Sequence, residues 1–185
     1  MSPMPPYRLP DSLDTPRHRL RRPVAADAQA IFDAYASDPQ VTRFLGWRAH
    51  EILRDTQTFL RAVDGEWQRG TGAALLIFPQ DDPGHLIGMI HPHLRGHIVT
   101  YGYVLRRDAW GQGISSEVLA TLVTHALAHP AIFRCEAFCD AEHPASARVM
   151  EKAGMTREGL LKRYFRHPNL SDSPRDCILY ARTKL

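Results

Sequence analysis

The stretch WGQGISSEV, residues 110 to 118, contains the turn that decides the fold. Residues 100 to 105, TYGYVL, are typical of a strand, and an apolar-periodic helix begins after Gly113. A chain that ends a strand, turns over Gly111 and Gly113 and opens a helix points several backbone N–H groups into one concavity. The helix dipole adds positive charge there, and glycine lets the backbone approach a bulky anion. The stretch predicts a phosphate cradle, with a plain strand-to-helix connection as the alternative.

Two common nucleotide-binding patterns do not fit this turn. A P-loop needs a Gly-Lys pair followed by Ser or Thr, which is absent. A dinucleotide fingerprint needs a third glycine where Ser116 stands, in an early β-α-β unit, and this turn comes late in the chain. Both nucleotide-binding patterns are therefore weak matches to this turn.

The composition is typical of one globular domain. The chain has 185 residues, 44% of them hydrophobic and 23% charged, and a net charge of +3. So small a surplus does not favour nucleic acid as a partner, although it suits an anionic small ligand. No apolar segment resembles a secretory signal or a membrane span, which predicts a cytoplasmic protein without a membrane partner. We expect an extended N-terminal arm, residues 1–16, followed by one domain, residues 17–185.

The three cysteines, Cys135, Cys139 and Cys177, are odd in number and form no Cys-x-x-Cys pair. The first two lie four residues apart in an expected strand, which places them on one face. We interpret them as small buried residues in a reducing compartment, because zinc would need more ligands at closer spacing. His125 and His129 are one helical turn apart, but no third ligand is evident, so no metal is expected.

The periodicity of apolar residues predicts helices, a β meander, and then a β-α-β-α-β-β order. The strand after the glycine-turn helix could run parallel to the strand before it. The fold class is a mixed α/β sheet in a single domain, mostly antiparallel with flanking helices. The expected helices are residues 25–37, 38–47, 50–70, 113–129 and 144–154, and the expected strands are 17–23, 72–78, 85–93, 98–105, 132–139, 155–165 and 176–185.

The segment LRRDAWGQGISSEV, residues 105 to 118, resembles the acyl-CoA-binding motif of the GNAT superfamily of N-acetyltransferases. That motif, Q/R-x-x-G-x-G/A, falls on Trp110, Gly113 and Ser115. The Trp-Gly-Gln-Gly form is similar to the RimJ/RimL-type branch, which acetylates N-termini of ribosomal proteins. Further segments resemble that branch in its usual order: FLGW (44–47), HPASARVMEKAGM (143–155), REGLLKRYF (157–165) and NLSDSPRDCILYA (169–181).

The resemblance implies a GNAT fold whose fourth and fifth strands splay apart to admit the pantetheine arm of CoA. It implies that pantetheine pairs with the backbone of Tyr103, Val104 and Leu105. It implies that the pyrophosphate sits on the backbone N–H groups of Gly111, Gln112, Gly113, Ile114, Ser115 and Ser116. Arg106 and Arg107 could add charge for the phosphates, or could simply be solvated.

Three departures from the family pattern concern catalysis. The position of a frequent glutamate base is Thr100, which cannot take a proton at neutral pH. The usual asparagine is His143, which could bind pantetheine or only cap the following helix. A tyrosine acid of other GNAT enzymes is replaced by Met150, so the resemblance makes Ser146 the candidate partner of the CoA thiolate, with helix capping as the alternative.

The acceptor is expected to be an amine of low pKa. A terminal α-amine with a pKa of about 8 is roughly one-tenth neutral at pH 7, whereas a lysine amine is neutral in only about one part in two thousand. A weak base or a water chain could then suffice, and His91, His93 and Glu136 are candidates for it. We expect the acceptor pocket to contain Phe44, Trp47, Tyr164, Asn169 and Asp172.

The sequence thus predicts an acyl-CoA-dependent N-acyltransferase, with acetyl-CoA as co-substrate and direct attack by a primary amine. Positioning and electrostatics would supply most of the rate. The acceptor could be a peptide N-terminus, a polyamine or an antibiotic amine. The sequence does not decide the oligomeric state, and a homodimer is one possibility. The alternatives are a succinyl-CoA-type acyltransferase, a GNAT-fold acyl-CoA-binding module without catalysis, and an RNA-associated factor suggested by the basic segment RHRLRR (17–22).

Overall fold

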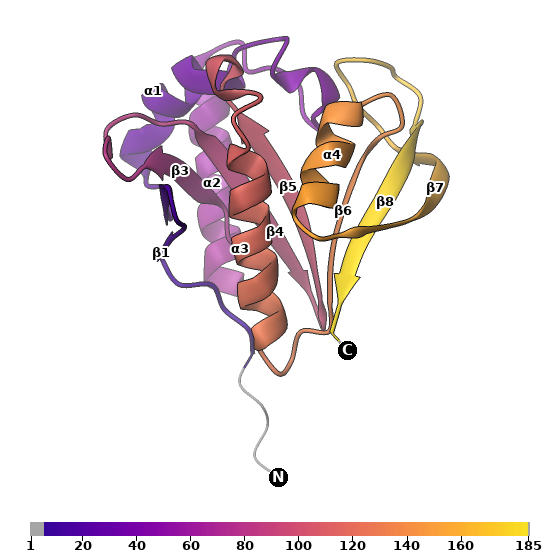
Figure 1. The fold of residues 1–185 in the computed structure, drawn as a ribbon. Helices are drawn as coiled ribbons and strands as arrows, with labels where there is room; N and C mark the ends of the chain where they lie inside the picture. The colour runs from indigo at the N-terminus through magenta and orange to yellow at the C-terminus, as the bar shows by residue number, and fades with distance from the viewer. Residues whose placement is uncertain (1–5, 185) are drawn as a thin grey trace.

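The computed structural model describes residues 6–184 and contains one mixed sheet of eight strands in the order β1-β2-β3-β4-β5-β6-β8-β7 (Figure 1). All neighbouring pairs are antiparallel except β5 and β6. The predicted mixed sheet is therefore confirmed. The strands are β1 (Ser12–Asp14), β2 (His18–Arg21), β3 (Leu75–Pro79), β4 (Gly88–Arg95), β5 (Ile98–Leu105), β6 (Arg134–Asp140), β7 (Thr156–Phe165) and β8 (Arg175–Thr183).

Helices cover both faces of the sheet: α1 and α2 lie on one face, and α3 and α4 on the other (Figure 1). This explains why Leu75, Leu76 and Ile77, successive residues of β3, are all fully buried. The helices are α1 (Ala28–Ile31), continued by a π-helical turn (Phe32–Ala36), α2 (Leu53–Arg69), α3 (Ile114–Ala128) and α4 (Pro144–Lys152).

Helix α2 has a clear start and stop. The Asp55 carboxylate accepts the N–H groups of Glu51 and Ile52, at 3.0 and 3.2 Å, and satisfies donors at the helix start. Gly70 ends the helix in the left-handed conformation, with φ of 69°. The helix packs against the sheet, where its Glu66 carboxylate is bonded to His91 of β4.

The two parallel strands separate over half their length. β5 and β6 pair only from Ile98–Thr100 to Arg134–Glu136. Beyond that point β6 still pairs with β8 as far as Asp140, and β5 with β4 as far as Leu105. The expected parallel pairing and splay are both present, and the splay leaves strand edges of β5 and β6 facing a gap.

The structure differs from the sequence expectations near the N-terminus. Ser12–Asp14, within the expected arm, forms strand β1 beside β2, and Tyr7 and Leu9 are buried in the core. The apolar side chains of this segment cover one end of the core, which no local pattern indicates. The first five residues of the arm lie outside the described residues. The expected helix 38–47 is only a 3₁₀ turn, Thr42–Phe44, because the chain turns extended at Leu45.

Two smaller points concern burial and membranes. All three cysteines are buried and unbonded to one another, as expected for small apolar residues. Within residues 6–184, no helix is long and apolar enough to cross a membrane.

Candidate active site

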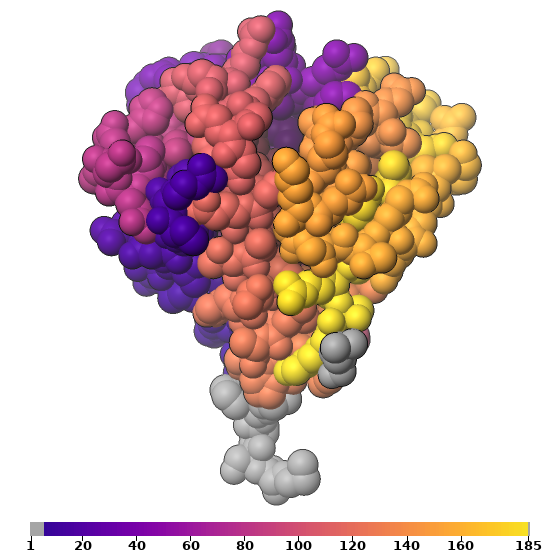
Figure 2. All heavy atoms as spheres, in the orientation of Figure 1, coloured from indigo at the N-terminus to yellow at the C-terminus, as the bar shows by residue number. Residues whose placement is uncertain are grey.

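A cavity of about 870 Å³ opens where β5 and β6 separate. Its walls come from the turn before α3, the start of α4, the face of β4 and β5, and the segment around residues 41–47. Figure 2 shows the surface hollowed between the segments that carry α3 and α4, with purple atoms of the segment before α2 behind. The sequence-predicted residues that line it are Phe44, Trp47, Thr100, Tyr103, Val104, Leu105, Gly111, Gly113, Ile114, Ser115, Ser116, His143 and Ser146.

The cradle has the backbone geometry that the glycines predict. Gly111 and Gly113 both have left-handed φ angles, 77° and 75°, which other residues adopt only with strain. The first N–H groups of a helix have no partner within it, and Glu117 is the first here to bond back, to the Gly113 carbonyl at 3.1 Å. No atom lies within 4 Å of a Cβ built on Gly111. The cradle is therefore open in front of its donors, which fits a phosphate.

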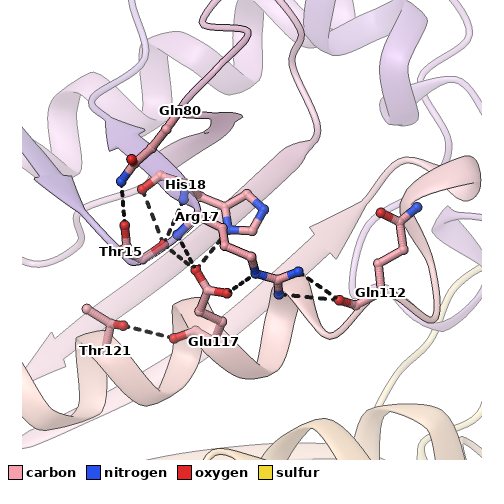
Figure 3. Close-up of polar contacts among 7 residues, drawn as sticks. All are labelled: Thr15, Arg17, His18, Gln80, Gln112, Glu117 and Thr121. Carbon is pink, nitrogen blue, oxygen red and sulfur yellow. Dashed lines mark hydrogen bonds and ion pairs between the residues drawn. The ribbon is translucent and has the colours of Figure 1, made fainter.

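The cradle is tied to the N-terminal segment by one carboxylate (Figure 3). Glu117 accepts hydrogen bonds from the Thr15 hydroxyl at 2.7 Å and the Arg17 backbone at 2.9 Å, and lies 3.1 Å from His18 Nδ1. Burial alone would raise the pKa of Glu117, but the hydrogen bonds from Thr15, Arg17 and His18 outweigh it and lower the pKa to about 2. The carboxylate is charged at any physiological pH.

Arg17 is a cation near the cradle that sequence reasoning did not assign to it. Its guanidinium pairs with Glu117 at 2.5 Å and donates to the Gln112 carbonyl at 3.3 and 3.4 Å (Figure 3). Ninety-five residues separate Arg17 from Gln112, so only the basic segment RHRLRR gave any signal. The side chain remains 54% exposed, and it supplies positive charge at the edge of the cradle.

Two hydroxyl groups meet on the α4 side of the cavity. Tyr103 of β5 and Ser146 of α4 have their hydroxyl oxygens 2.7 Å apart, and the Tyr103 hydroxyl also donates to the Ser146 carbonyl at 3.2 Å. Burial raises the pKa of Tyr103 above its usual value, so the phenol keeps its proton. The Ser146 hydroxyl is thus held by a partner across the cavity, whereas sequence reasoning placed only the backbone of Tyr103 here.

His143 lies at the start of α4, but its side chain makes no capping hydrogen bond. The imidazole stacks on Phe44, with ring centroids 4.2 Å apart and planes within 10°. Burial lowers the pKa of His143, so the ring is neutral near pH 7. The stack joins α4 to the segment before α2, and forms one wall of the cavity.

Asp140 supports this wall from beneath. It is 1% exposed and accepts two hydrogen bonds from Arg175, at 2.5 and 3.1 Å. Burial would raise the pKa of Asp140, but the bonds from Arg175 and the Glu142 N–H lower it. The charged pair fixes the end of β6, beyond the point where β5 and β6 part.

Thr100 lies at the last paired position of β5, where the gap begins. Its hydroxyl donates to Glu136 at 3.2 Å, and Glu136 also accepts a bond from Arg134 at 2.6 Å. Glu136 is therefore held by a cation and does not line the cavity. His91 and His93, the other two residues considered for proton transfer, do line it.

Three predicted acceptor residues do not line the cavity. Asn169 instead holds the acceptor-side segment, because its amide donates to the carbonyls of Thr42 and Trp47 at 2.8 and 2.7 Å. Tyr164 is half exposed on β7 and packs edge-on against Phe138. The side chain of Asp172 is 99% exposed.

Three predicted CoA-binding residues also lie outside the cavity lining. Arg106 is turned toward Asp108 and His85, at 2.6 and 3.3 Å. Arg107 is exposed at the start of the 3₁₀ turn Arg107–Ala109. Gln112 donates its side-chain amide to the Asp108 carbonyl at 2.9 Å, which stiffens the glycine turn.

Comparison with known proteins agrees with this geometry. Residues 17–156 match the family described as Acetyltransferase (GNAT) domain. The chain is 28% identical to the uncharacterized N-acetyltransferase YoaA of Bacillus subtilis, over 93% of this chain and 96% of that protein. It is 30% identical to the ribosomal-protein-serine acetyltransferase of Escherichia coli, over 62% of this chain and 63% of that protein.

A solved structure shares the fold. It is that of RimL, the ribosomal L7/L12 alpha-N-protein acetyltransferase, in complex with coenzyme A. The two chains match with a TM-score of 0.80 at 23% identity, over 92% of this chain and 96% of that one. The chain therefore belongs to the GNAT acetyltransferase family and is an acyl-CoA-dependent N-acyltransferase.

Proposed function

We propose that the protein transfers an acetyl group from acetyl-CoA to a primary amine of low pKa, above all the α-amine of a peptide N-terminus. The observation that carries this proposal is that one cavity joins the open cradle, the unpaired edge of β5 and the Tyr103–Ser146 hydroxyl pair. The cradle would take the phosphates, the edge of β5 the pantetheine arm, and the hydroxyl pair the thioester sulfur.

The cradle would hold the pyrophosphate through the N–H groups of residues 111–116, and the dipole of α3 would favour its negative charge. Arg17 would add a cation beside it, at the edge that Gln112 forms. The edge of β5 that β6 leaves unpaired, at Tyr103, Val104 and Leu105, would pair with the amides of pantetheine. Few side chains are needed for these contacts, which suits the small residues of the turn.

The Ser146 hydroxyl would donate a hydrogen bond to the leaving thiolate. Its oxygen lies 2.7 Å from the Tyr103 hydroxyl, whose proton stays in place because burial raises the pKa of Tyr103. A donor aimed at developing charge is worth about 10²–10³ in kcat in other enzymes. The two hydroxyls would act together, with Ser146 nearer the start of α4 and its positive dipole end.

The acceptor would enter beside Phe44, Trp47 and His143. The stacked pair of Phe44 and His143 presents an apolar, uncharged wall, because burial keeps His143 neutral. Such a wall suits a neutral amine better than a charged one. Two relatives named above act on N-termini or serine of ribosomal proteins, which supports an α-amine acceptor.

A cytoplasmic location and a homodimer remain parts of the proposal.

Thiol release from acetyl-CoA tests the proposal. The acceptors are Ala- and Ser-starting peptides, polyamines and aminoglycosides, with succinyl-CoA as a second donor. We expect release with one amine class only. No release with any pair, while calorimetry still detects CoA binding, would instead support an acyl-CoA-binding module.

The matched variants are Gly113→Trp and Gly96→Trp. Both glycines have left-handed φ angles, 75° and 61°, so both variants suffer similar backbone strain. A Cβ at Gly96 would meet open space, and one at Gly113 would make only an ordinary contact, 3.8 Å from Arg17 Nη2. Only Gly113 lines the cavity. We expect Gly113→Trp to weaken CoA binding more than 100-fold, on the order of 3 kcal/mol, and Gly96→Trp to leave it unchanged. Equal losses in both would mean that the turn at residues 110–113 is not a CoA cradle.

A further inference from the structure

Thr100 leaves the reaction without a proton acceptor on β5, but the neighbouring strand brings three other groups to the same place. Glu66 of α2 accepts a hydrogen bond from His91 Nε2 at 2.7 Å. His93 Nδ1 lies 3.8 Å from the same carboxylate oxygen, and the two histidine rings are 3.9 Å apart. The mechanism proposed above uses none of these three residues.

The register of the sheet puts this cluster on the acceptor side. His93 of β4 lies directly opposite Thr100 of β5, and directly opposed residues project from the same face within about 5 Å. Tyr103 projects from the other face, toward Ser146 of α4. His93 therefore faces the cavity from the side opposite Ser146, whose hydroxyl would donate to the leaving thiolate. An attacking amine requires its proton acceptor on that opposite side.

The surroundings of His93 keep its imidazole unprotonated and make it a weak base. Burial and the neighbouring His91 lower the pKa of His93 to about 4, against the opposing effect of Glu66, so its imidazole is neutral near pH 7. Among the described residues, His93 makes no hydrogen bond, and half of its side chain is exposed. Glu136, the other carboxylate near Thr100, is occupied by Arg134.

We propose that His93 accepts the proton of the acceptor amine, with Glu66 and His91 as positioning residues; this inference rests on the N-acyl transfer proposed above. The neutral amine attacks the thioester carbonyl, and a C–N bond forms. The proton leaves the amine nitrogen for His93, directly or through one water. The C–S bond breaks, and its electron pair goes to sulfur. The thiolate takes a proton from solvent through Ser146, and His93 returns its proton to solvent.

The same three donor atoms, all within 4.8 Å of one another, could also hold a metal ion. The two roles differ in whether catalysis depends on a bound ion. Proton transfer by His93 predicts that activity survives EDTA. Loss of wild-type activity in EDTA, restored by Zn²⁺, would overturn the assignment of His93.

The first test is His93→Ala, with thiol release measured using the best peptide acceptor. We expect kcat/KM to fall about 100-fold, the low end for general-base catalysis, with an unchanged Kd for CoA. Added imidazole should restore part of the activity, because the side chain it replaces is exposed to the cavity. His97→Ala, an exposed histidine of the same hairpin outside the cavity lining, should behave as wild type.

The second test concerns the positioning role. Glu66→Gln should lower kcat and leave KM for the peptide unchanged, and Glu66→Gln combined with His93→Ala should be no worse than His93→Ala alone. Additive losses, or loss in His93→Ala without rescue by imidazole, would overturn the inference. If His93→Ala were as active as the wild type, only the inference about His93 would be overturned. If the wild-type protein were inactive with every amine, the proposed function would be overturned as well.

Discussion

The two ends of the cavity are built differently. The cradle consists of backbone N–H groups from one continuous stretch, residues 111–116, fixed from outside by Glu117 and Arg17. The acceptor end consists of side chains from distant segments, such as Phe44 stacked on His143 and His93 beside Glu66. The cradle can therefore accept many side-chain changes if the backbone path is kept. The acceptor end determines chemistry and specificity, and changes there should alter rates rather than CoA affinity.

A large loss of kcat is expected where the two ends meet, at the Tyr103–Ser146 pair. Ser146→Ala removes the donor to the thiolate and should lower kcat about 100-fold, with little change in the Kd for CoA. Tyr103→Phe should cause a smaller loss of kcat, because the serine keeps its own proton. Tyr164→Phe, which removes a half-exposed hydroxyl outside the cavity, is the control.

Steady-state kinetics with saturating acetyl-CoA measures these changes. If Ser146→Ala raised the Kd for CoA 100-fold and left kcat intact, the hydroxyl would belong to the cradle, and the division into two ends would be wrong at this point. Equal losses of kcat in Tyr103→Phe and Tyr164→Phe would assign no special role to the hydroxyl pair.

The middle effect concerns the support of the cradle. Glu117→Gln weakens the bonds to Thr15, Arg17 and His18 and should reduce the free energy of unfolding by about 1–2 kcal/mol near pH 7. Because the folded-state pKa is lowered to about 2 from an ordinary 4.5, this stabilisation is complete above pH 4.5. It is lost as the pH falls toward 2, so wild type and variant should converge in acid.

Urea unfolding at several pH values measures this convergence. Glu142→Gln, which alters an exposed carboxylate bound to Arg175, is the control and should cost little. CoA binding by Glu117→Gln should weaken only a few-fold, since the N–H donors remain. A loss as large as in Gly113→Trp would mean that the cradle depends on Arg17 more than on its backbone.

The same division explains what the sequence could predict. The glycine turn, the helix after it and the parallel pairing of the strands on either side follow from local patterns, and the splay of those strands follows from the family resemblance. All are present. The hydroxyl pair joins residues 43 positions apart, and the amide of Asn169 reaches back 127 positions to Thr42. No periodicity indicates such contacts. The sequence analysis accordingly places Asn169 in the acceptor pocket. In the structure its amide instead holds the segment that carries Trp47.

The smallest effect is expected at Asp172, which the sequence analysis places in the acceptor pocket. Its side chain is 99% exposed and lies 3.9 Å from Arg48, and it is absent from the cavity lining. So exposed a charge contributes little, because solvent screens it. Asp172→Asn should leave kcat and KM within about twofold of wild type for peptides and polyamines alike. A tenfold rise in KM for polyamines alone would extend the acceptor end to the β7–β8 loop, and would favour a polycationic acceptor over a peptide N-terminus.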